Sequence, residues 1–307
     1  MLRRILLYLS SALWARRIVT HWGVARRMAR RFVAGETLEE AITAAQSLKN
    51  RGLLVSLDYL GESVRNAQDT ADVVAMYHRL LARIEETETQ ASVSLKLTHL
   101  GLDISEDLCI TNLRQILTDA QARNLLVTID MESSAYTERT LRIYRTMHDE
   151  YDFKNVGTVL QTYLYRTAED ARALAVEGAH IRLCKGAYLE PPAVAFPQKA
   201  DVDRNFVTIM TDFLKTPGTA YLCIASHDEG ILQQAEALLT QDPSLTSRSE
   251  FQMLYGVRSA RQDTLAKAGY PVRVYMPFGE AWYPYFMRRL AERPANLWFM
   301  VKNLLRN

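Results

Sequence analysis

Residues 156–184 read VGTVLQTYLYRTAEDARALAVEGAHIRLC, and this stretch contains the smallest unit that decides the fold. Two short apolar runs, Val156–Leu160 and His180–Cys184, flank the segment Ala168–Val176, whose apolar residues recur at helical spacing. Short β-branched or apolar runs between turns are typical of buried strands. Two such strands joined by one helix form a parallel βαβ unit. The stretch therefore predicts one unit of a parallel sheet.

The same alternation continues on both sides of this unit. Further strand-like runs occupy Leu53–Leu57, Val93–Leu97, Leu125–Ile129, Tyr221–Ala225, Phe251–Tyr255 and Val272–Met276. Helical spacing recurs at Asp72–Ile84, Leu113–Ala122, Glu138–Met147, Phe206–Leu214, Ile231–Leu239 and Ser259–Lys267. Eight strand–helix units in regular order predict an α/β fold, a closed (βα)8 barrel of the TIM type. A doubly wound sheet is the alternative, but it rarely needs eight unbroken units.

The segment before Arg51 does not belong to this repeat. We expect a basic helical N-terminal arm over residues 1–50 and a barrel domain with a C-terminal helix over residues 51–307. Thr37 and Glu40 fit a capping box, which predicts a helix that starts near Leu38. Residues 1–35 contain four arginine pairs and no acidic residue. Two interpretations stay open: the arm lies on an anionic membrane, or it packs on the barrel or on a second subunit of a homo-oligomer.

The composition excludes several classes of protein. The 37 basic and 35 acidic side chains give a net charge of only +2, which predicts no nucleic-acid partner. No apolar run reaches the roughly 18 residues that span a membrane. The cysteines Cys109, Cys184 and Cys223 lack metal-ligand spacing, so we expect no metal site and a reducing cytoplasm, with the inner face of the cell membrane as a further location. Neither a Rossmann nor a P-loop motif is present.

Ionisable residues gather where the predicted strands end. They are Asp58, Lys96, Asp130, Glu132, Arg182, Lys185 and His227. Barrel enzymes build their active sites at the C-terminal ends of the strands. A single charge at such a place is often only entering solvent. The repetition at corresponding positions instead favours a charged pocket for a small carboxylate substrate.

Two of these residues alternate with apolar neighbours and are therefore expected to point into the barrel. Lys96 shares a face with Ser94 and Thr98, and Arg182 lies between Ile181 and Leu183. A lysine there can bind an anion, or form a Schiff base if its pKa is depressed. A buried arginine needs a partner. Asp130, Glu62 or an anionic ligand could supply it.

The C-terminal segment offers two more cations. On a helix, Tyr285 lies on the same face as Arg288 and Arg289, three and four residues later. A ring beside two guanidinium groups suits a small molecule with a carboxylate and an apolar body. The alternative is a solvated helix surface on which both arginines pair with Glu292.

Taken in order, these motifs resemble the proline dehydrogenase family, and most closely its short bacterial monofunctional members. The resemblance runs from about Arg30 to Arg306. Its landmarks are LGE at 60–62, SLKLTHLG at 94–101, IDME at 129–132, VLQTY at 159–163, RLCKGAY at 182–188, SHD at 226–228, EFQMLYG at 250–256 and the segment from Tyr275 to Asn296.

The resemblance implies a distorted barrel that binds FAD without covalent attachment and oxidises L-proline to Δ1-pyrroline-5-carboxylate, with a membrane quinone reoxidising the flavin. It implies that Asp130 and Arg182 are catalytic, and that Glu62 and Tyr188 form a gate. The substrate would be bound by Lys96, Tyr275, Tyr285, Arg288 and Arg289. FAD would be bound by Met131, Gln161, Lys185, Gly186, Ala187, Ser226 and His227. A Schiff-base lyase and a catalytically silent membrane-associated binding protein are the alternatives.

Overall fold

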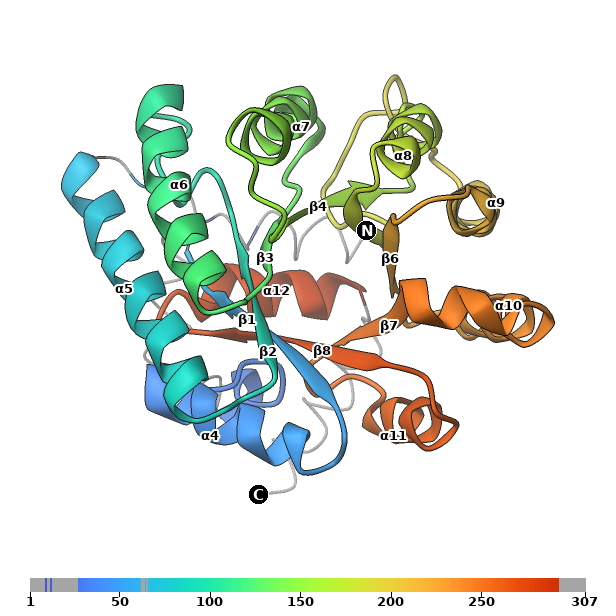
Figure 1. The fold of residues 1–307 in the computed structure, drawn as a ribbon, viewed down its shortest axis with the longest axis horizontal. Helices are drawn as coiled ribbons and strands as arrows, with labels where there is room; N and C mark the ends of the chain where they lie inside the picture. Colours follow the sequence, from blue (N-terminus) through green and yellow to red (C-terminus); the bar gives the residue numbers. More distant parts are fainter. Residues whose placement is uncertain (1–8, 10–11, 13–26, 62–63, 65, 293–307) are drawn as a thin grey trace.

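The computed structural model describes residues 9, 12, 27–61, 64 and 66–292 of the chain. Its strands form a closed parallel barrel in the order β1 to β8, and β1 pairs with β8 to close it. This confirms the predicted (βα)8 fold (Figure 1). The strands are β1 (Leu54–Tyr59), β2 (Ala91–Leu95), β3 (Val127–Ile129), β4 (Val156–Gln161), β5 (His180–Cys184), β6 (Tyr221–Ala225), β7 (Ser249–Leu254) and β8 (Val272–Phe278).

Helices surround the strands and connect them in turn (Figure 1). They are α4 (Leu38–Lys49), α5 (Ala67–Glu86), α6 (Glu106–Ala122), α7 (Thr137–Arg145), α8 (Thr167–Val176), α9 (Lys199–Lys215), α10 (Glu229–Gln241), α11 (Ser259–Lys267) and α12 (Trp282–Glu292). A π-helical turn, Thr146–Glu150, extends α7, and short 3-10 turns occupy Ser134–Tyr136 and Pro243–Arg248. No helix among the described residues has the length and apolar composition needed to cross a membrane.

Two predicted strand boundaries were wrong in ways that affect the site. β2 ends at Leu95, so Lys96 follows the strand instead of lying within it, because the chain turns there with hydrogen bonds from the His99 amide to the Lys96 carbonyl and from Leu100 to Leu97. β8 continues to Phe278, because it pairs with β1 as far as Tyr59.

The side chains that point into the barrel differ in polarity from those that point outward. Ile181 and Leu183 of β5 are fully buried in the core between strands and helices, whereas Arg182 between them points inward. Ser94 of β2 and Gln252 of β7 also point inward, where both contact Arg182. The two-residue alternation therefore predicted the direction of Arg182 correctly. The barrel interior is polar, and the apolar core lies around it.

The N-terminal boundary of the barrel is a helix with a confirmed capping box. The Thr37 hydroxyl accepts a hydrogen bond from the Glu40 amide, and a Glu40 carboxylate oxygen accepts from the amides of Glu36 and Thr37. The buried face of α4, with Ala41, Ile42, Ala45 and Leu48, joins the main core. The division at residue 50 stays a prediction.

His180 opens β5, at the opposite end of that strand from its charged terminus. Its ring stacks on Tyr221 at 4.8 Å, and the Cys223 sulfur lies 3.8 Å from Nε2. Burial lowers the pKa of His180 to about 4, while nearby Glu250 opposes this shift and Arg273 and Arg182 reinforce it. The neutral imidazole is therefore the form that fits the fold.

This histidine predicts a pH-dependent loss of stability. Between pH 6.5 and about 4 the unfolded chain binds the His180 proton and the folded chain does not, so the free energy of unfolding should fall as the pH drops through this window. The full shift represents roughly 3 kcal/mol, and the loss should be smaller because part of the ring reaches solvent. Urea unfolding from pH 7.5 to 4.5 measures it. His180→Phe should flatten the slope, and an unchanged slope would contradict the prediction.

Candidate active site

A cavity of about 410 Å³ opens at the C-terminal ends of the strands. This volume is in the range of small-molecule binding sites. Strand ends, the segments that follow them and α12 all contribute to its wall. The wall consists of Asp58, Lys96, Asp130, Met131, Val159, Gln161, Arg182, Cys184, Lys185, Gly186, Ala187, Tyr188, Ala225, Ser226, His227, Asp228, Gln252, Met253, Leu254, Tyr275, Tyr285, Arg288 and Arg289.

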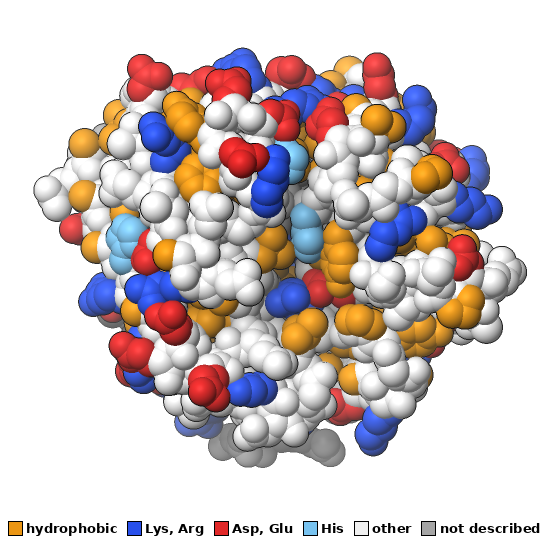
Figure 2. Space-filling model, viewed as in Figure 1, with side chains coloured by type: hydrophobic (Ala, Val, Ile, Leu, Met, Phe, Trp, Pro, Cys, Tyr) orange, Lys and Arg blue, Asp and Glu red, His pale blue; other side chains and the backbone are white. Residues whose placement is uncertain are grey.

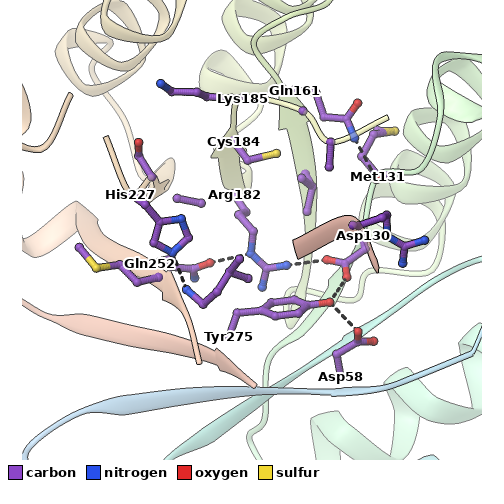
Figure 3. A pocket seen from close by; sticks show the side chains of 18 of the residues that line it. Asp58, Asp130, Met131, Gln161, Arg182, Cys184, Lys185, His227, Gln252 and Tyr275 are labelled. Atoms are coloured by element: carbon purple, nitrogen blue, oxygen red, sulfur yellow. Dashed lines mark hydrogen bonds and ion pairs between the residues drawn. The ribbon is translucent and has the colours of Figure 1, made fainter. Parts of the chain in front are cut away.

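The structure brings the predicted site residues together around this cavity. All the predicted site residues line the cavity except Glu62. Glu62 lies outside the described residues, and so does the predicted pair between Glu62 and Arg182. Glu132, a charged strand-end residue, does not line the cavity, because its carboxylate accepts hydrogen bonds from the amide and hydroxyl of Thr98. Figure 3 shows how the labelled side chains converge from several strands.

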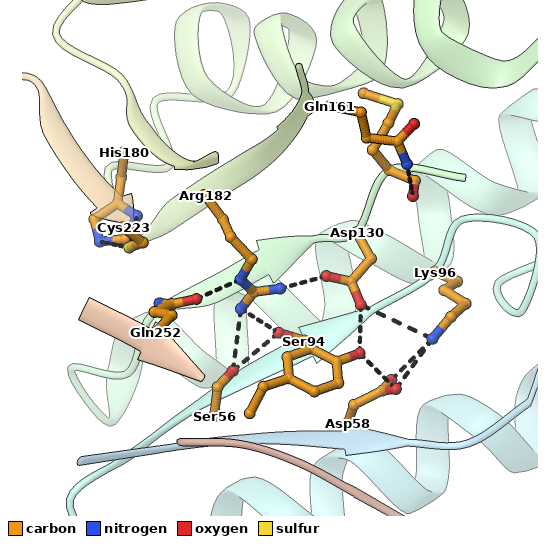
Figure 4. A network of polar contacts seen from close by, with 12 residues as sticks. Ser56, Asp58, Ser94, Lys96, Asp130, Gln161, His180, Arg182, Cys223 and Gln252 are labelled. Atoms are coloured by element: carbon orange, nitrogen blue, oxygen red, sulfur yellow. Dashed lines mark hydrogen bonds and ion pairs between the residues drawn. The ribbon is translucent and has the colours of Figure 1, made fainter. Parts of the chain in front are cut away.

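Arg182 lies at the centre of the buried polar network. Its Nη1 donates to Asp130 Oδ1 at 2.5 Å, its Nε to Gln252 Oε1 at 2.6 Å and its Nη2 to Ser94 Oγ at 2.9 Å (Figure 4). Burial opposes its charge, but the Asp130 carboxylate and the nearby Tyr275 hydroxyl, with smaller contributions from other neighbours, together keep the pKa of Arg182 above its ordinary value. Of the three partners considered for this arginine, Asp130 is the one that it contacts among the described residues. These hydrogen bonds fix the guanidinium in one orientation.

Lys96 pairs with the strand-end carboxylate of Asp58. Its Nζ donates to both carboxylate oxygens of Asp58, at 3.1 and 3.2 Å, and lies 3.9 Å from Asp130 Oδ2. Burial disfavours the ammonium, but Asp58 and Asp130 outweigh it and raise the pKa of Lys96. A lysine held in its charged form is a poor nucleophile. The geometry therefore favours anion binding by Lys96 over Schiff-base chemistry.

Tyr275 joins the two carboxylates. Its hydroxyl lies 2.7 Å from Asp58 Oδ2 and 2.7 Å from Asp130 Oδ2, and its ring packs 4.9 Å from the Arg182 guanidinium carbon. A hydroxyl has one proton, so it donates to one carboxylate at a time. The other oxygen contact is satisfied only when its carboxyl group is protonated. Burial, together with the neighbouring charge of Asp58, raises the pKa of Asp130 against the effect of Arg182. The cluster of Asp58, Asp130 and Tyr275 can therefore bind one additional proton.

Beneath Arg182 a second ion pair extends the network down the barrel. Gln252 Nε2 donates to Glu250 Oε1 at 2.6 Å, and Arg273 Nε donates to the same oxygen at 2.7 Å. Glu250 is 2% exposed. Burial of this carboxyl group is outweighed by Arg273, which keeps the pKa of Glu250 below its ordinary value. Gln252 thus connects two buried arginine–carboxylate pairs and fixes the side of Arg182 away from Asp130.

The rim between β5 and β6 holds a cluster of charges. Lys185 Nζ contacts Asp203 at 2.5 Å and Asp228 at 2.9 Å, and Lys199 contacts the same two carboxylates. His227 Nε2 accepts a hydrogen bond from the Leu254 amide at 2.9 Å. This contact assigns the imidazole proton to Nδ1, which is thereby a donor. The rim is rich in groups that hold polar parts of a ligand.

Gln161 presents an acceptor at the wall of the cavity. Its Nε2 donates to the carbonyls of Met131 and Glu132 at 3.1 and 3.2 Å, which fixes the amide group. Its Oε1 is buried and accepts no hydrogen bond from any described residue. Leaving a buried acceptor unsatisfied is costly. The atom therefore indicates a ligand with an N–H or O–H group.

The helix α12 forms the remaining wall. Tyr285, Arg288 and Arg289 line the cavity, and the Arg289 guanidinium carbon lies 5.1 Å from the Tyr285 ring centre. A neighbouring cavity of about 360 Å³ shares Lys96, Tyr285 and Arg288 with the first. The two arginines therefore belong to the pocket wall and not to a helix surface that faces only solvent. The side chain of Glu292 lies outside the described residues.

Asp58 and Gln252 are wall residues of the buried polar network that were not assigned a role from the sequence. Asp58 was identified as a strand-end charge, but nothing in the chain order indicates that it pairs with Lys96. Gln252 follows Glu250 by two residues, so both point to the same side of β7. The alternation that revealed Arg182 could have revealed this polar face too. Among the described residues, no group of His, Cys, Asp and Glu side chains is placed to hold a metal ion.

Comparisons with known proteins agree with this geometry. Residues 41–302 match the family model described as proline dehydrogenase. The chain is 42% identical to Proline dehydrogenase 1 of Bacillus subtilis over the full length of both chains. It is 39% identical to Proline dehydrogenase of Deinococcus radiodurans, covering 91% of this chain and 90% of that one. The crystal structure of proline utilization A from Bdellovibrio bacteriovorus superposes with a TM-score of 0.79 at 25% identity, over 87% of this chain and 32% of that longer chain.

Proposed function

The chain belongs to the proline dehydrogenase family, whose members are flavoenzymes of proline catabolism, and on this premise we propose that it oxidises L-proline to Δ1-pyrroline-5-carboxylate with bound FAD. The observation that carries the proposal is the convergence of Lys96, Arg288 and Arg289 on one cavity that also contains Arg182. Three cations are more than one structural ion pair needs, and they suit a small carboxylate.

The wall of the cavity fits a flavin ring. A flavin carries one ring N–H and several ring nitrogen and carbonyl acceptors. The buried Gln161 Oε1 suits the N–H, and Arg182 offers positive charge to the acceptors. Met131, Gln161, Lys185, Gly186, Ala187, Ser226 and His227 would hold FAD. When bound, the flavin accepts a hydride, and positive charge near it favours the electron-rich reduced form.

The other residues act on the substrate. Lys96, Arg288 and Arg289 would bind the carboxylate of proline, and Tyr275 and Tyr285 would pack on its ring. This fixes the orientation of the carbon beside the nitrogen, on which the rate of hydride transfer depends. The nitrogen must first lose a proton. Asp58 Oδ2 and Asp130 Oδ2, joined through the Tyr275 hydroxyl, have room for that proton. Asp130 and Arg182 would thus be catalytic, with Glu62 and Tyr188 as a gate.

We propose a membrane quinone as the acceptor of the electrons. This proposal is based on the basic residues 1–35 of the N-terminal arm, which would bind to an anionic membrane surface. The face shown in Figure 2 carries interspersed charges of both signs, so contact with lipid would depend on the arm more than on this face. Flotation with anionic vesicles, with and without residues 1–35, tests the membrane contact, and a chain that floats equally well without them would contradict it.

A spectrum tests the reaction itself. Purified protein should be yellow, and L-proline added without oxygen should bleach the flavin absorbance nearly completely. D-proline should bleach the flavin far more slowly. Its carboxylate cannot bind the three cations while its reacting carbon faces the flavin. A colourless protein that cannot be loaded with FAD, or a yellow one that L-proline does not bleach, would refute the proposal.

A further inference from the structure

The segment of residues 28–36, here called the arm segment, packs on α12. Ala29, Phe32 and Val33 are buried with Trp282, Phe286 and Leu290 in a small apolar cluster separate from the main core. The Phe32 and Phe286 ring centres lie 6.4 Å apart. Trp282, Phe286 and Leu290 are spaced by four residues and so form one stripe of α12. Tyr285, Arg288 and Arg289 occupy the adjacent stripe, which lines the cavity.

Hydrogen bonds fix the arm segment to the connection between β8 and α12. The Ala34 amide donates to the Pro277 carbonyl at 2.8 Å, and the Gly279 amide donates to the Gly35 carbonyl at 3.0 Å. The Trp282 indole nitrogen donates to Glu36 Oε1 at 3.1 Å. These contacts join the arm segment to the end of β8, to the connection that follows it and to the first residue of α12.

The backbone of the arm segment also comes very close to the barrel rim. A Cβ added to Gly256, which follows β7 with a φ of +70°, would lie 1.7 Å from the Arg31 carbonyl oxygen. Only glycine leaves room for this crossing and adopts that backbone conformation without strain. The arm segment is thus confined between the rim and α12.

Within the described part of the chain, helices and strands give α12 little support from behind. No described helix or strand packs on α12 as closely as α5 packs on α6. The apolar stripe of α12 instead shares one cluster with the arm segment and Leu60, and Leu9, Ala12 and Val257 also pack against this cluster. The rotation of α12 about its axis, and with it the direction of the two arginines, depends on these irregular segments.

We propose that the arm segment is a positioning element for substrate binding, which holds α12 so that Arg288 and Arg289 face the cavity. The inference rests on the proposed role of these arginines and extends it to residues that do not touch the substrate. Carboxylate binding is expected to be equally strong in the ground state and the transition state. Loosening α12 should therefore weaken the binding of proline much more than it slows the hydride transfer.

The test is Phe32→Ala in the full chain loaded with FAD. Removing the ring leaves a void between the arm segment and α12. We expect KM for L-proline to rise roughly tenfold to hundredfold, as small displacements of binding groups do. The kcat should change by less than about twofold, and the flavin content and visible spectrum should stay as in the natural chain, because the flavin side of the pocket is untouched.

A matched control separates positioning from general stability. Phe206 of α9 is also fully buried but lies in the main core, so Phe206→Ala should lower the unfolding midpoint while KM stays within about twofold. Phe32→Leu keeps most of the volume and should restore KM most of the way. If Phe32→Ala does not fold, Phe32→Val replaces it as the test, because it removes the ring but leaves a smaller void. Equal KM values for the Phe32 variants, the Phe206 variant and the natural chain would overturn the proposal. Failure of the natural chain to react with proline would instead refute the proposed function.

Discussion

Arg182→Met is expected to lower both the stability of the protein and its rate of proline oxidation. The substitution leaves the buried Asp130 without the guanidinium that lies 2.5 Å away, and it removes the donor to Gln252. Removing one member of a buried ion pair typically costs about 3–5 kcal/mol. The rate of flavin reduction should fall by about 10²–10³-fold, the usual effect of losing one preorganised charge at the reacting atoms. Urea unfolding and rapid-mixing reduction by L-proline measure the two effects.

A second substitution separates these two consequences. In Arg182→Met with Asp130→Asn no unpaired buried carboxylate remains, so part of the lost stability should return. The rate should not return, because the positive charge at the flavin is still missing and the proposed proton acceptor Asp130 is lost as well. Arg273→Met is the control, since it breaks the deeper pair with Glu250 at the other end of the network. It should destabilise the fold with a smaller effect on the rate. If the double variant recovers the rate as well, Arg182 acts only through the fold.

Arg289→Met is expected to raise KM for L-proline by about 10²–10³-fold, since losing one partner of a buried charged pair costs about 2–5 kcal/mol. The kcat should fall less, and the flavin should remain bound. Arg289→Lys should recover only part of the affinity, because an ammonium cannot bind a carboxylate in a bidentate fork. Steady-state kinetics over a wide range of proline concentration measures these changes.

A surface arginine provides the comparison. Arg114 is exposed and packs over the Tyr151 ring at 4.0 Å, far from any wall residue in the chain order. Arg114→Met removes the same charge and should leave KM unchanged. If Arg289→Met behaves like Arg114→Met, the arginines of α12 belong to a solvated surface, which is the interpretation that their helical spacing alone favours.

The repeat of strands and helices predicted most of the fold because burial follows the backbone period. β5 and β6 have the predicted bounds, since their apolar runs stop where the strands do. β3 is shorter than predicted and begins at Val127, because Leu125 still belongs to the turn after α6, where its amide bonds the Ala120 carbonyl. Apolar character alone does not separate such a turn from a strand.

The site was predicted less completely, because pairing between distant strands is not visible in chain order. The direction of Arg182 follows from its neighbours, but its choice of Asp130 as a partner follows from the closure of the barrel. Asp58 and Lys96 come from adjacent strands and meet only when β1 and β2 are in register, with Asp58 opposite Ser94. The helical spacing of Arg288 and Arg289 is compatible with a solvent-exposed surface and with a pocket wall. Which of the two they face depends on how α12 is packed against the rest of the fold.

The packing of the arm segment on α12 has a consequence for the order of folding. Phe32 leaves the ribosome early, whereas Phe286, its partner in the ring pair, is among the last described residues to appear. The hydrogen bond from the Tyr283 hydroxyl to the Leu9 carbonyl spans 274 positions in the chain. Contacts so distant in sequence form late, because the intervening chain must be ordered first. A nascent chain can therefore complete most of its strands before α12 is in place, and the proposed carboxylate site is complete only after the arm segment and α12 have packed together.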